Sequence, residues 1–221
     1  MDAVSSFRVN PVPDDSDGRV QQMLDTERGA VYIEGPLSSE QLSAYTMCSG
    51  LCKFRQPGDQ HLALIDIAKL PEGLVFIARC GSLIVGYITF HYPEFERWAE
   101  SGIPCLLELG ALEVSTHWRG LGISRELVQI PFYNGRLEEK IIVSMECYWC
   151  WDLRNTDLSI WEYRNMMEKL LTKPGFETKA TDDPDISSHP ANILSVRIGS
   201  RVCEDDIARF EALRFRRRWL L

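Results

Sequence analysis

Short apolar runs alternate along the chain with amphipathic stretches, and this pattern predicts a sheet flanked by helices. The runs are bounded by Gly, Pro or polar clusters, which is typical of strands. They predict strands at residues 30–34, 74–79, 83–92, 106–114, 140–148 and 193–198. Apolar residues at helical spacing predict helices at 39–48, 60–68 and 157–171, another ending near Gln129, and one at the C-terminus. No βαβ unit repeats, so the pattern favours an α+β fold with a mixed sheet over a doubly wound one.

Residues 1–28 lack this periodicity. They carry prolines, aspartates and a glycine with few apolar positions, so we expect a loose leader there. The remaining residues, 29–221, have the length of one domain, with a C-terminal helical extension.

The charge balance excludes several classes of function. The chain has 24 Lys and Arg against 32 Asp and Glu, a net charge of −8. Binding to nucleic acid or an anionic membrane needs an excess of positive surface, so neither partner is expected. The longest apolar stretches, 74–78 and 83–90, are far shorter than the roughly 18 residues of a membrane span. Seven cysteines and no secretory leader predict a reduced, cytoplasmic protein.

The segment ELGALEVSTHWRGLGIS, residues 108–124, carries the clearest chemical signal. A strand is expected to end at Val114, and a helix to begin within Arg119-Gly120-Leu121-Gly122-Ile123-Ser124. Small residues let backbone N–H groups approach a phosphate, while the helix N-terminus and Arg119 add positive charge. The segment therefore predicts a pyrophosphate site, although two glycines can also simply form a tight turn. It lacks the glycine patterns of dinucleotide and triphosphate loops.

This loop, with a hairpin before it, a strand after it and a later helix ending at Gly175-Phe176, resembles the GNAT acyltransferase superfamily. The superfamily motif Q/R-x-x-G-x-G/A binds the pyrophosphate of acetyl-CoA, and Ser124 departs from it at the last position. The resemblance implies a GNAT fold, acetyl-CoA as co-substrate between strands 106–114 and 140–148, and no metal. The cofactor-binding residues it implies are Leu112, Val114, Arg119, Gly120, Leu121, Gly122, Ile123 and Ser124.

Six longer runs resemble the AcuA family of acetoin utilisation proteins. They are IEGP (33–36), LPEG (70–73), IVGY (84–87), ELGALEV (108–114), WEYR (161–164) and ISSHPAN (186–192). The resemblance implies a protein lysine acetyltransferase that modifies AMP-forming acetyl-CoA synthetase and inactivates it. Two alternatives stay open: an N-acetyltransferase for small amines, and a non-catalytic acyl-CoA-binding regulator that clamps a partner protein.

Lysine acetylation requires a general base, because a lysine ammonium has a pKa near ~10.4 and must lose a proton before it attacks a thioester. Glu108 is the first candidate, since it resembles the base glutamate of the superfamily in its placement. Glu113 is the second. Their spacing of five places them on opposite faces of a regular strand. Either glutamate can instead be a structural, capped or ion-paired carboxylate.

Other features admit two interpretations each. The superfamily often has a tyrosine as general acid where this chain has Leu171, which leaves Tyr148 and Tyr163 as weak substitutes. Aromatic residues at 148, 149, 151 and 161 are expected to pack in the core, or else to line a groove for the protein substrate. A zinc site at Cys48, Cys52, Cys147 and Cys150 is disfavoured against reduced thiols. The hypothesis for Asp182, Asp183 and Asp185 is contact with the protein substrate.

Overall fold

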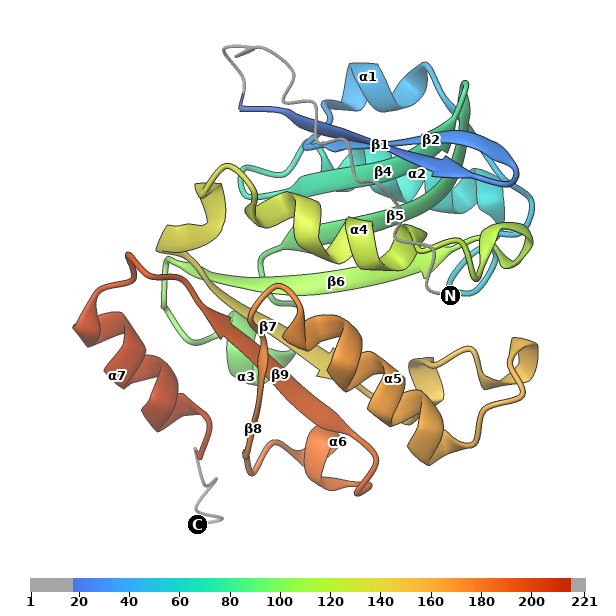
Figure 1. Cartoon of the computed structure of the whole chain (residues 1–221). Helices are drawn as coiled ribbons and strands as arrows, with labels where there is room; N and C mark the ends of the chain where they lie inside the picture. The colour runs from blue at the N-terminus through green and yellow to red at the C-terminus, as the bar shows by residue number, and fades with distance from the viewer. Residues whose placement is uncertain (1–17, 216–221) are drawn as a thin grey trace, which may run out of the picture. The chain divides into compact units, whose positions relative to one another are not determined.

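The strands predicted from the apolar runs are present in the computed structural model, which describes residues 18–215 (Figure 1). By their contacts these residues divide into two units. The first holds residues 18–70, 74–89 and 112–134, and the second holds 71–73, 90–111 and 135–215. Strands β5 (Leu83–His91) and β6 (Leu106–Val114) each contribute to both units. A single domain over residues 29–221 stays a prediction.

The first unit is built on a sheet in the order β1-β2-β4-β5. The strands besides β5 are β1 (Val20–Thr26), β2 (Gly29–Gly35) and β4 (Leu74–Cys80). A two-residue strand, β3 (Thr46–Met47), runs parallel to β5. The helices are α1 (Ser39–Ser43), α2 (Pro57–Ile67) and α4 (Ile123–Gln129). Both α2 and α4 contact β4, from opposite faces of the sheet (Figure 1), which explains why residues 75–78 are buried.

Strand β1 corrects one expectation, because it lies inside the segment predicted to be a loose leader. It pairs with β2 along its whole length, from Val20 opposite Gly35 to Thr26 opposite Gly29. Backbone hydrogen bonds hold β1 in place, and only Gln22 on it is buried, so no apolar alternation marked it in the sequence. The leader prediction is therefore wrong over Val20–Thr26, and residues 1–17 lie outside the described part of the chain.

The second unit has the strand order β6-β7-β9-β8. The strands besides β6 are β7 (Ile141–Glu146), β8 (Glu177–Lys179) and β9 (Ile193–Ile198). Strand β7 runs parallel to β6 and antiparallel to β9. On one face, α3 (Glu96–Ala99), α6 (Pro184–Ser187) and α7 (Glu204–Leu213) share a core to which Trp98, Ile186 and Phe210 contribute. Helix α5 (Ile160–Thr172) lies on the near side of β7 in Figure 1, and α3 lies behind it.

Capping side chains set helix boundaries that periodicity placed only approximately. Ser38 and Gln41 bond reciprocally at the start of α1, but the helix ends at Ser43 rather than Cys48 because the chain enters β3. Ser159 and Glu162 form the same reciprocal pair, so α5 begins at Ile160 instead of Asp157. Short 3-10 helices occupy residues 116–118, 130–132, 136–139, 148–150 and 153–155.

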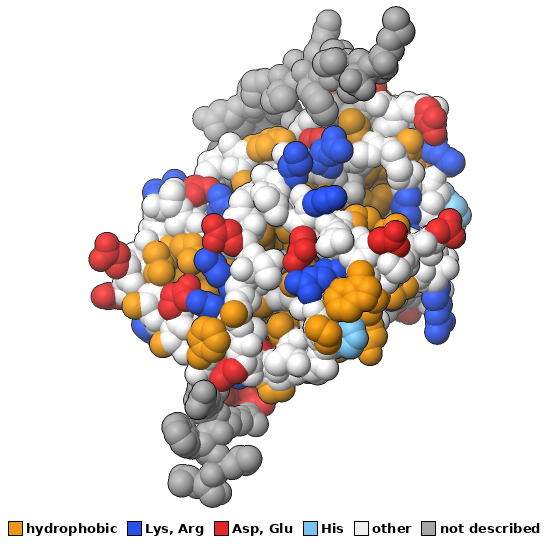
Figure 2. Space-filling view, turned by 60° about the horizontal axis from the view of Figure 1, so that its bottom comes forward, with side chains coloured by type: hydrophobic (Ala, Val, Ile, Leu, Met, Phe, Trp, Pro, Cys, Tyr) orange, Lys and Arg blue, Asp and Glu red, His pale blue; other side chains and the backbone are white. Residues whose placement is uncertain are grey.

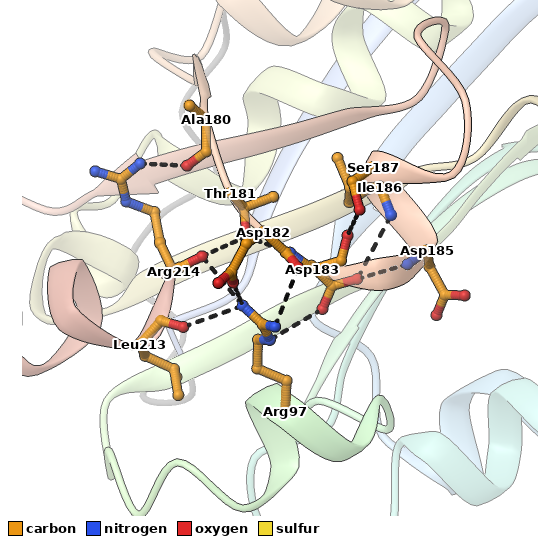
Figure 3. A network of polar contacts seen from close by, with 10 residues as sticks. All are labelled: Arg97, Ala180, Thr181, Asp182, Asp183, Asp185, Ile186, Ser187, Leu213 and Arg214. Atoms are coloured by element: carbon orange, nitrogen blue, oxygen red, sulfur yellow. Dashed lines mark hydrogen bonds and ion pairs between the residues drawn. The ribbon is translucent and has the colours of Figure 1, made fainter. Parts of the chain in front are cut away.

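The loop before α6, which carries Asp182 and Asp183, makes hydrogen bonds and ion pairs with other parts of its unit (Figure 3). Arg97 on α3 donates to the carboxylate of Asp182, pairs with Asp183 at 3.4 Å, and donates to the Arg214 carbonyl at 3.1 Å. Asp183 is 3% exposed and caps α6, accepting the Asp185 N–H at 3.0 Å. Asp182 and Asp183 therefore have structural partners, and of the three aspartates hypothesised to meet a substrate only Asp185 is exposed.

Replacing Asp183 by Ala should lower the free energy of unfolding by about 2–3 kcal/mol, because it removes a helix cap and one of the carboxylates around Arg97. Urea denaturation followed by tryptophan fluorescence measures this. The matched control is Asp185→Ala in the same loop, whose carboxylate is exposed, and its change should stay within about 0.5 kcal/mol. Equal losses in the two variants would contradict a structural role for Asp183.

Candidate active site

Strand β6 ends at Val114 and leads into the loop that the sequence marks as an anion site. Arg119 is extended, whereas Gly120 and Gly122 have φ values of 80° and 81°, in the left-handed region that favours glycine. A Cβ added at either glycine would meet no atom within 4 Å. The backbone conformation, and not a lack of space, therefore requires glycine at both positions.

Helix α4 begins directly after this turn, with Gly122 as its N-cap. The Gly122 carbonyl accepts from the N–H groups of Arg125 at 3.1 Å and Glu126 at 3.4 Å. The N–H groups of Ile123 and Ser124 precede these bonds, in the position where helices leave donors for an outside acceptor. Arg119 donates from Nε to the Val114 carbonyl at 3.4 Å, so its charge stays beside the loop. This arrangement suits a phosphate or pyrophosphate.

Hydrogen bonds to Gly50 and Val85, in the same unit, hold the start of the loop in place. The N–H of Thr116 donates to the Gly50 carbonyl at 3.2 Å, and the N–H of the fully buried Ser115 donates to the Val85 carbonyl at 2.9 Å. A Cβ on Gly50 would lie 2.4 Å from the Ser115 hydroxyl, so only glycine permits this approach. The loop conformation is thus fixed by contacts distant in the sequence.

Glu108 is a buried carboxyl in the second unit. It is 6% exposed, lies opposite Val143 in the ladder between β6 and β7, and accepts the Glu94 N–H at 3.0 Å. Burial raises the pKa of Glu108 above its usual range, and the Glu94 N–H and the nearby His91 offset this only in part. A carboxylate with a raised pKa is a stronger base once ionised, which is what deprotonating an ammonium requires.

Glu113 is also buried, but both of its carboxylate oxygens have fixed donors. One accepts the Lys53 N–H at 2.8 Å, and the other accepts the Tyr87 hydroxyl at 2.6 Å. Burial raises the pKa of Tyr87, and the negative charge of Glu113 raises it further, so the phenol remains a donor. These contacts tie β5, β6 and the segment at Lys53 together and favour a structural role for Glu113. Glu108 is the better candidate for the base.

The structure distributes the predicted site residues over the two units. Glu108 lies in the second unit, whereas Glu113, Leu112, Val114 and the loop residues 119–124 lie in the first. The second unit also holds His91, whose charge lowers the pKa of Glu108 and which was not among the site residues predicted from the sequence. A polar residue at the end of the apolar strand 83–91 was the only sequence signal for it.

The aromatic residues after β7 are only partly in a core. Trp151 is 6% exposed and stacks on Tyr163 with 5.2 Å between ring centroids, and Tyr148 lies 4.5 Å from the His189 ring. Trp149 and Trp161 are half exposed, so the expectation of core packing is wrong for these two. Figure 2 shows hydrophobic side chains reaching the surface among interspersed basic and acidic ones.

Within residues 18–215, no group of three or more His, Cys, Asp or Glu side chains is placed to hold a metal ion. The seven cysteines are free thiols. Burial, helped by the nearby Cys150, raises the pKa of Cys147 to about 12, which keeps this thiol protonated near neutral pH. The helices of the described region are all too short or too polar to cross a membrane.

Comparison with known proteins first identifies the class of protein. No protein-family profile matches the chain. The crystal structure of the GNAT domain of PAT from S. lividans superposes with a TM-score of 0.51 at 10% identity, covering 80% of this chain and 96% of that domain. This likeness shows the fold, and it confirms the predicted α+β GNAT architecture, a mixed, mostly antiparallel sheet with flanking helices. The chain therefore has the GNAT fold.

More similar relatives then identify the family. Acetoin utilization proteins AcuA of Bacillus licheniformis and Bacillus subtilis are 48% and 44% identical over 198 residues, which is 89% of this chain and 94% of each relative. The crystal structure of an acetoin utilization protein from Exiguobacterium sibiricum is 46% identical, with a TM-score of 0.87 over 90% of this chain and 95% of that one. The chain belongs to the AcuA family of acetoin utilisation proteins and is an N-acetyltransferase. The resemblance stated from the sequence is confirmed.

Proposed function

We propose that this N-acetyltransferase transfers the acetyl group of acetyl-CoA to a lysine of AMP-forming acetyl-CoA synthetase and thereby inactivates that enzyme. Membership in the AcuA family supports a role in acetoin utilisation. The observation that carries the proposal is Glu108, a buried carboxyl whose raised pKa suits removal of a proton from an ammonium group.

Acetyl-CoA binding is assigned to the loop after β6. The N–H groups of Ile123 and Ser124 and the guanidinium of Arg119 hold the pyrophosphate, which bears the negative charge that a helix N-terminus attracts. Gly120 and Gly122 give the loop the backbone conformation that presents these groups. Leu112 and Val114, at the end of β6, lie just before the loop and complete the proposed cofactor-binding set.

Transfer begins when the ionised Glu108 takes a proton from the lysine ammonium. The neutral amine then attacks the thioester carbonyl, a C–N bond forms, and the C–S bond breaks as the tetrahedral intermediate collapses. The thiolate of coenzyme A leaves with the electron pair of the C–S bond and takes up one proton. The amine nitrogen loses two protons in all, so one proton must reach solvent for each acetyl group transferred.

Replacing Arg119 by Ala should raise KM for acetyl-CoA by about 10-fold, since a charge-assisted contact to phosphate contributes about 1.5–3 kcal/mol and solvent screens part of it. The turnover number kcat should change little, because the pyrophosphate is remote from the reacting carbonyl. Steady-state kinetics of coenzyme A release measures both constants. Arg125→Ala is the control, because Arg125 is exposed on α4 beyond the loop. Equal effects of the two variants would contradict the assignment.

The test of the proposed function is intact-protein mass spectrometry of acetyl-CoA synthetase after incubation with this protein and acetyl-CoA, together with an assay of synthetase activity. We expect one acetyl group on a lysine and a matching loss of activity. Inhibition without a change in mass would support the clamp instead. Coenzyme A release with small amines, but without change in the synthetase, would identify a small-amine acetyltransferase.

A further inference from the structure

The imidazole of His91 has a fixed tautomer and a fixed position. His91 ends β5 and is 8% exposed. Its Nδ1 lies 2.6 Å from the carbonyl oxygen of Tyr92, so Nδ1 carries the hydrogen and donates it. In the neutral ring Nε2 is therefore the free acceptor, with its lone pair available to a proton.

The ring lies directly over Gly110 of β6. A Cβ built on Gly110 would be 2.1 Å from His91 Nε2 and 2.8 Å from Cδ2. The imidazole thus occupies the space where a side chain at position 110 would begin. Only glycine at this position leaves room for the ring, even though Gly110 is exposed and its backbone adopts no positive φ.

Strand geometry brings this ring to the same face as Glu108. Residues two apart in a strand point to the same face and lie about 6.5–7 Å apart. The ring over Gly110 therefore lies on the same face of β6 as the side chain of Glu108. The electrostatic effect of His91 on Glu108 agrees with this placement.

We propose that His91 receives the proton that Glu108 takes from the substrate amine and passes it to solvent, and that Gly110 is glycine in order to seat the ring there. This inference rests on the proposed role of Glu108 as the base. His91 acts through Glu108 and is a positioning and relay residue without contact to the substrate.

The transfer balances without any further reactant. Glu108 gains one proton from the ammonium and becomes a carboxylic acid. His91 Nε2 takes that proton, which restores the carboxylate and gives an imidazolium held by its Nδ1–H bond to Tyr92. The imidazolium then loses the Nε2 proton to water. This is the proton that the overall reaction releases, and Glu108 is ready for the next cycle.

Two charged groups face Glu108 from the segments packed against it. The positive form of His91 lowers the pKa of Glu108, and the carboxylate of Glu94, on the segment between β5 and α3, raises it. In a variant with a neutral residue at position 91, the effect of Glu94 remains and that of His91 is lost. The acidic limb of the pH profile of kcat/KM should then move to higher pH.

The first experiment measures coenzyme A release against pH for the wild type and His91→Gln. We expect a loss of about 10-fold in kcat at neutral pH, a smaller loss than the 10²–10⁴-fold typical of a direct acid or base. We also expect the acidic limb of kcat/KM at higher pH. His61→Gln is the matched control: His61 Nε2 bonds to the Leu42 carbonyl in the first unit, and its profile should keep the wild-type limb. If the acidic limb of kcat/KM for His91→Gln stayed at the wild-type pH, the proposed relay would be wrong.

Chemical rescue and a second variant separate a relay from a purely structural role. In His91→Ala, added imidazole should restore activity in proportion to its free-base concentration, because it fits the space of the lost ring. Gly110→Ala should displace the ring and reproduce the defect of His91→Ala, and combining the two should cost no more than either alone. Absence of rescue in a folded variant, or additive losses in the double variant, would overturn the inference.

Failure of the proposed function would look different. If Glu108→Gln kept wild-type activity, the assignment of the base would fall and the relay with it. If Glu108→Gln were inactive while His91→Gln kept the wild-type rate and pH profile, only the relay would fall. Circular dichroism and the denaturation midpoint of each variant establish that the comparison is made between folded proteins.

Discussion

Replacing Glu108 by Gln should lower kcat by about 10²–10⁴-fold, the range that removal of a general base produces. The amide has nearly the same shape as the carboxyl, and its carbonyl oxygen can still accept the Glu94 N–H that Glu108 accepts at 3.0 Å. Folding and acetyl-CoA binding should therefore survive, with KM for acetyl-CoA near its wild-type value. Coenzyme A release with the protein substrate measures both constants.

The pH dependence makes this expectation more specific. Only the ionised carboxylate can accept a proton, so activity should fall as the pH drops through the pKa of Glu108. Burial raises that pKa, which places the acidic limb of kcat/KM above the value of about 4.3 for an exposed glutamate. The residual activity of Glu108→Gln should show no such limb. Glu100→Gln, a change at an exposed glutamate of the same unit, should keep it. A Glu108→Gln enzyme that kept the limb would assign the base to another residue.

Strands β6 and β9 were predicted at their observed bounds, because each is a mainly apolar segment that polar or turn-forming residues flank. The turn at Gly120 and Gly122 and the helix after it were predicted for a similar local reason, since the glycine spacing is a property of the segment itself. The role of residues 119–124 in binding acetyl-CoA stays a prediction. Helix ends were less exact: α5 begins at Ile160 rather than Asp157, where Ser159 and Glu162 form the first-turn pair, and α1 ends at Ser43 rather than Cys48. Strand β1, the three-residue strand β8 and helix α6 carry little apolar signal.

The candidate site could be predicted only in part from the local sequence. Both Glu108 and Glu113 were recognised as candidates, but only tertiary contacts separate their roles. Glu113 is bonded to Tyr87 and to Lys53, which are 26 and 60 residues away in the sequence. His91 and Gly110 face each other across two strands, so the need for glycine at position 110 is invisible until the strands are placed. Arg97 likewise meets Asp182 and Asp183 across 85 and 86 residues of chain (182 − 97 and 183 − 97).

Replacing Glu34 by Gln should lower the free energy of unfolding by about 2–4 kcal/mol, less than the upper range for a fully buried pair because both partner arginines are partly exposed. Glu34 is itself fully buried at the end of β2. It accepts from Arg79 at 2.6 Å, from Arg19 at 2.5 Å and from the Tyr45 hydroxyl at 3.1 Å. The amide would leave two guanidinium groups without their carboxylate. Urea denaturation at neutral pH measures the loss.

The pH dependence of this loss has a definite sign. Burial alone would raise the pKa of Glu34, but the hydrogen bonds and charges of Arg79 and Arg19 outweigh it, so the pKa in the folded protein is lowered. Its stabilisation is therefore complete above the unfolded pKa, about 4.3, and disappears as the pH falls through the lower, folded pKa. The stabilities of wild type and Glu34→Gln should converge in that acidic range. Glu27→Gln, in the exposed turn between β1 and β2, should follow the wild type throughout. A constant difference between wild type and Glu34→Gln down to low pH would mean that shape, and not charge, accounts for the loss.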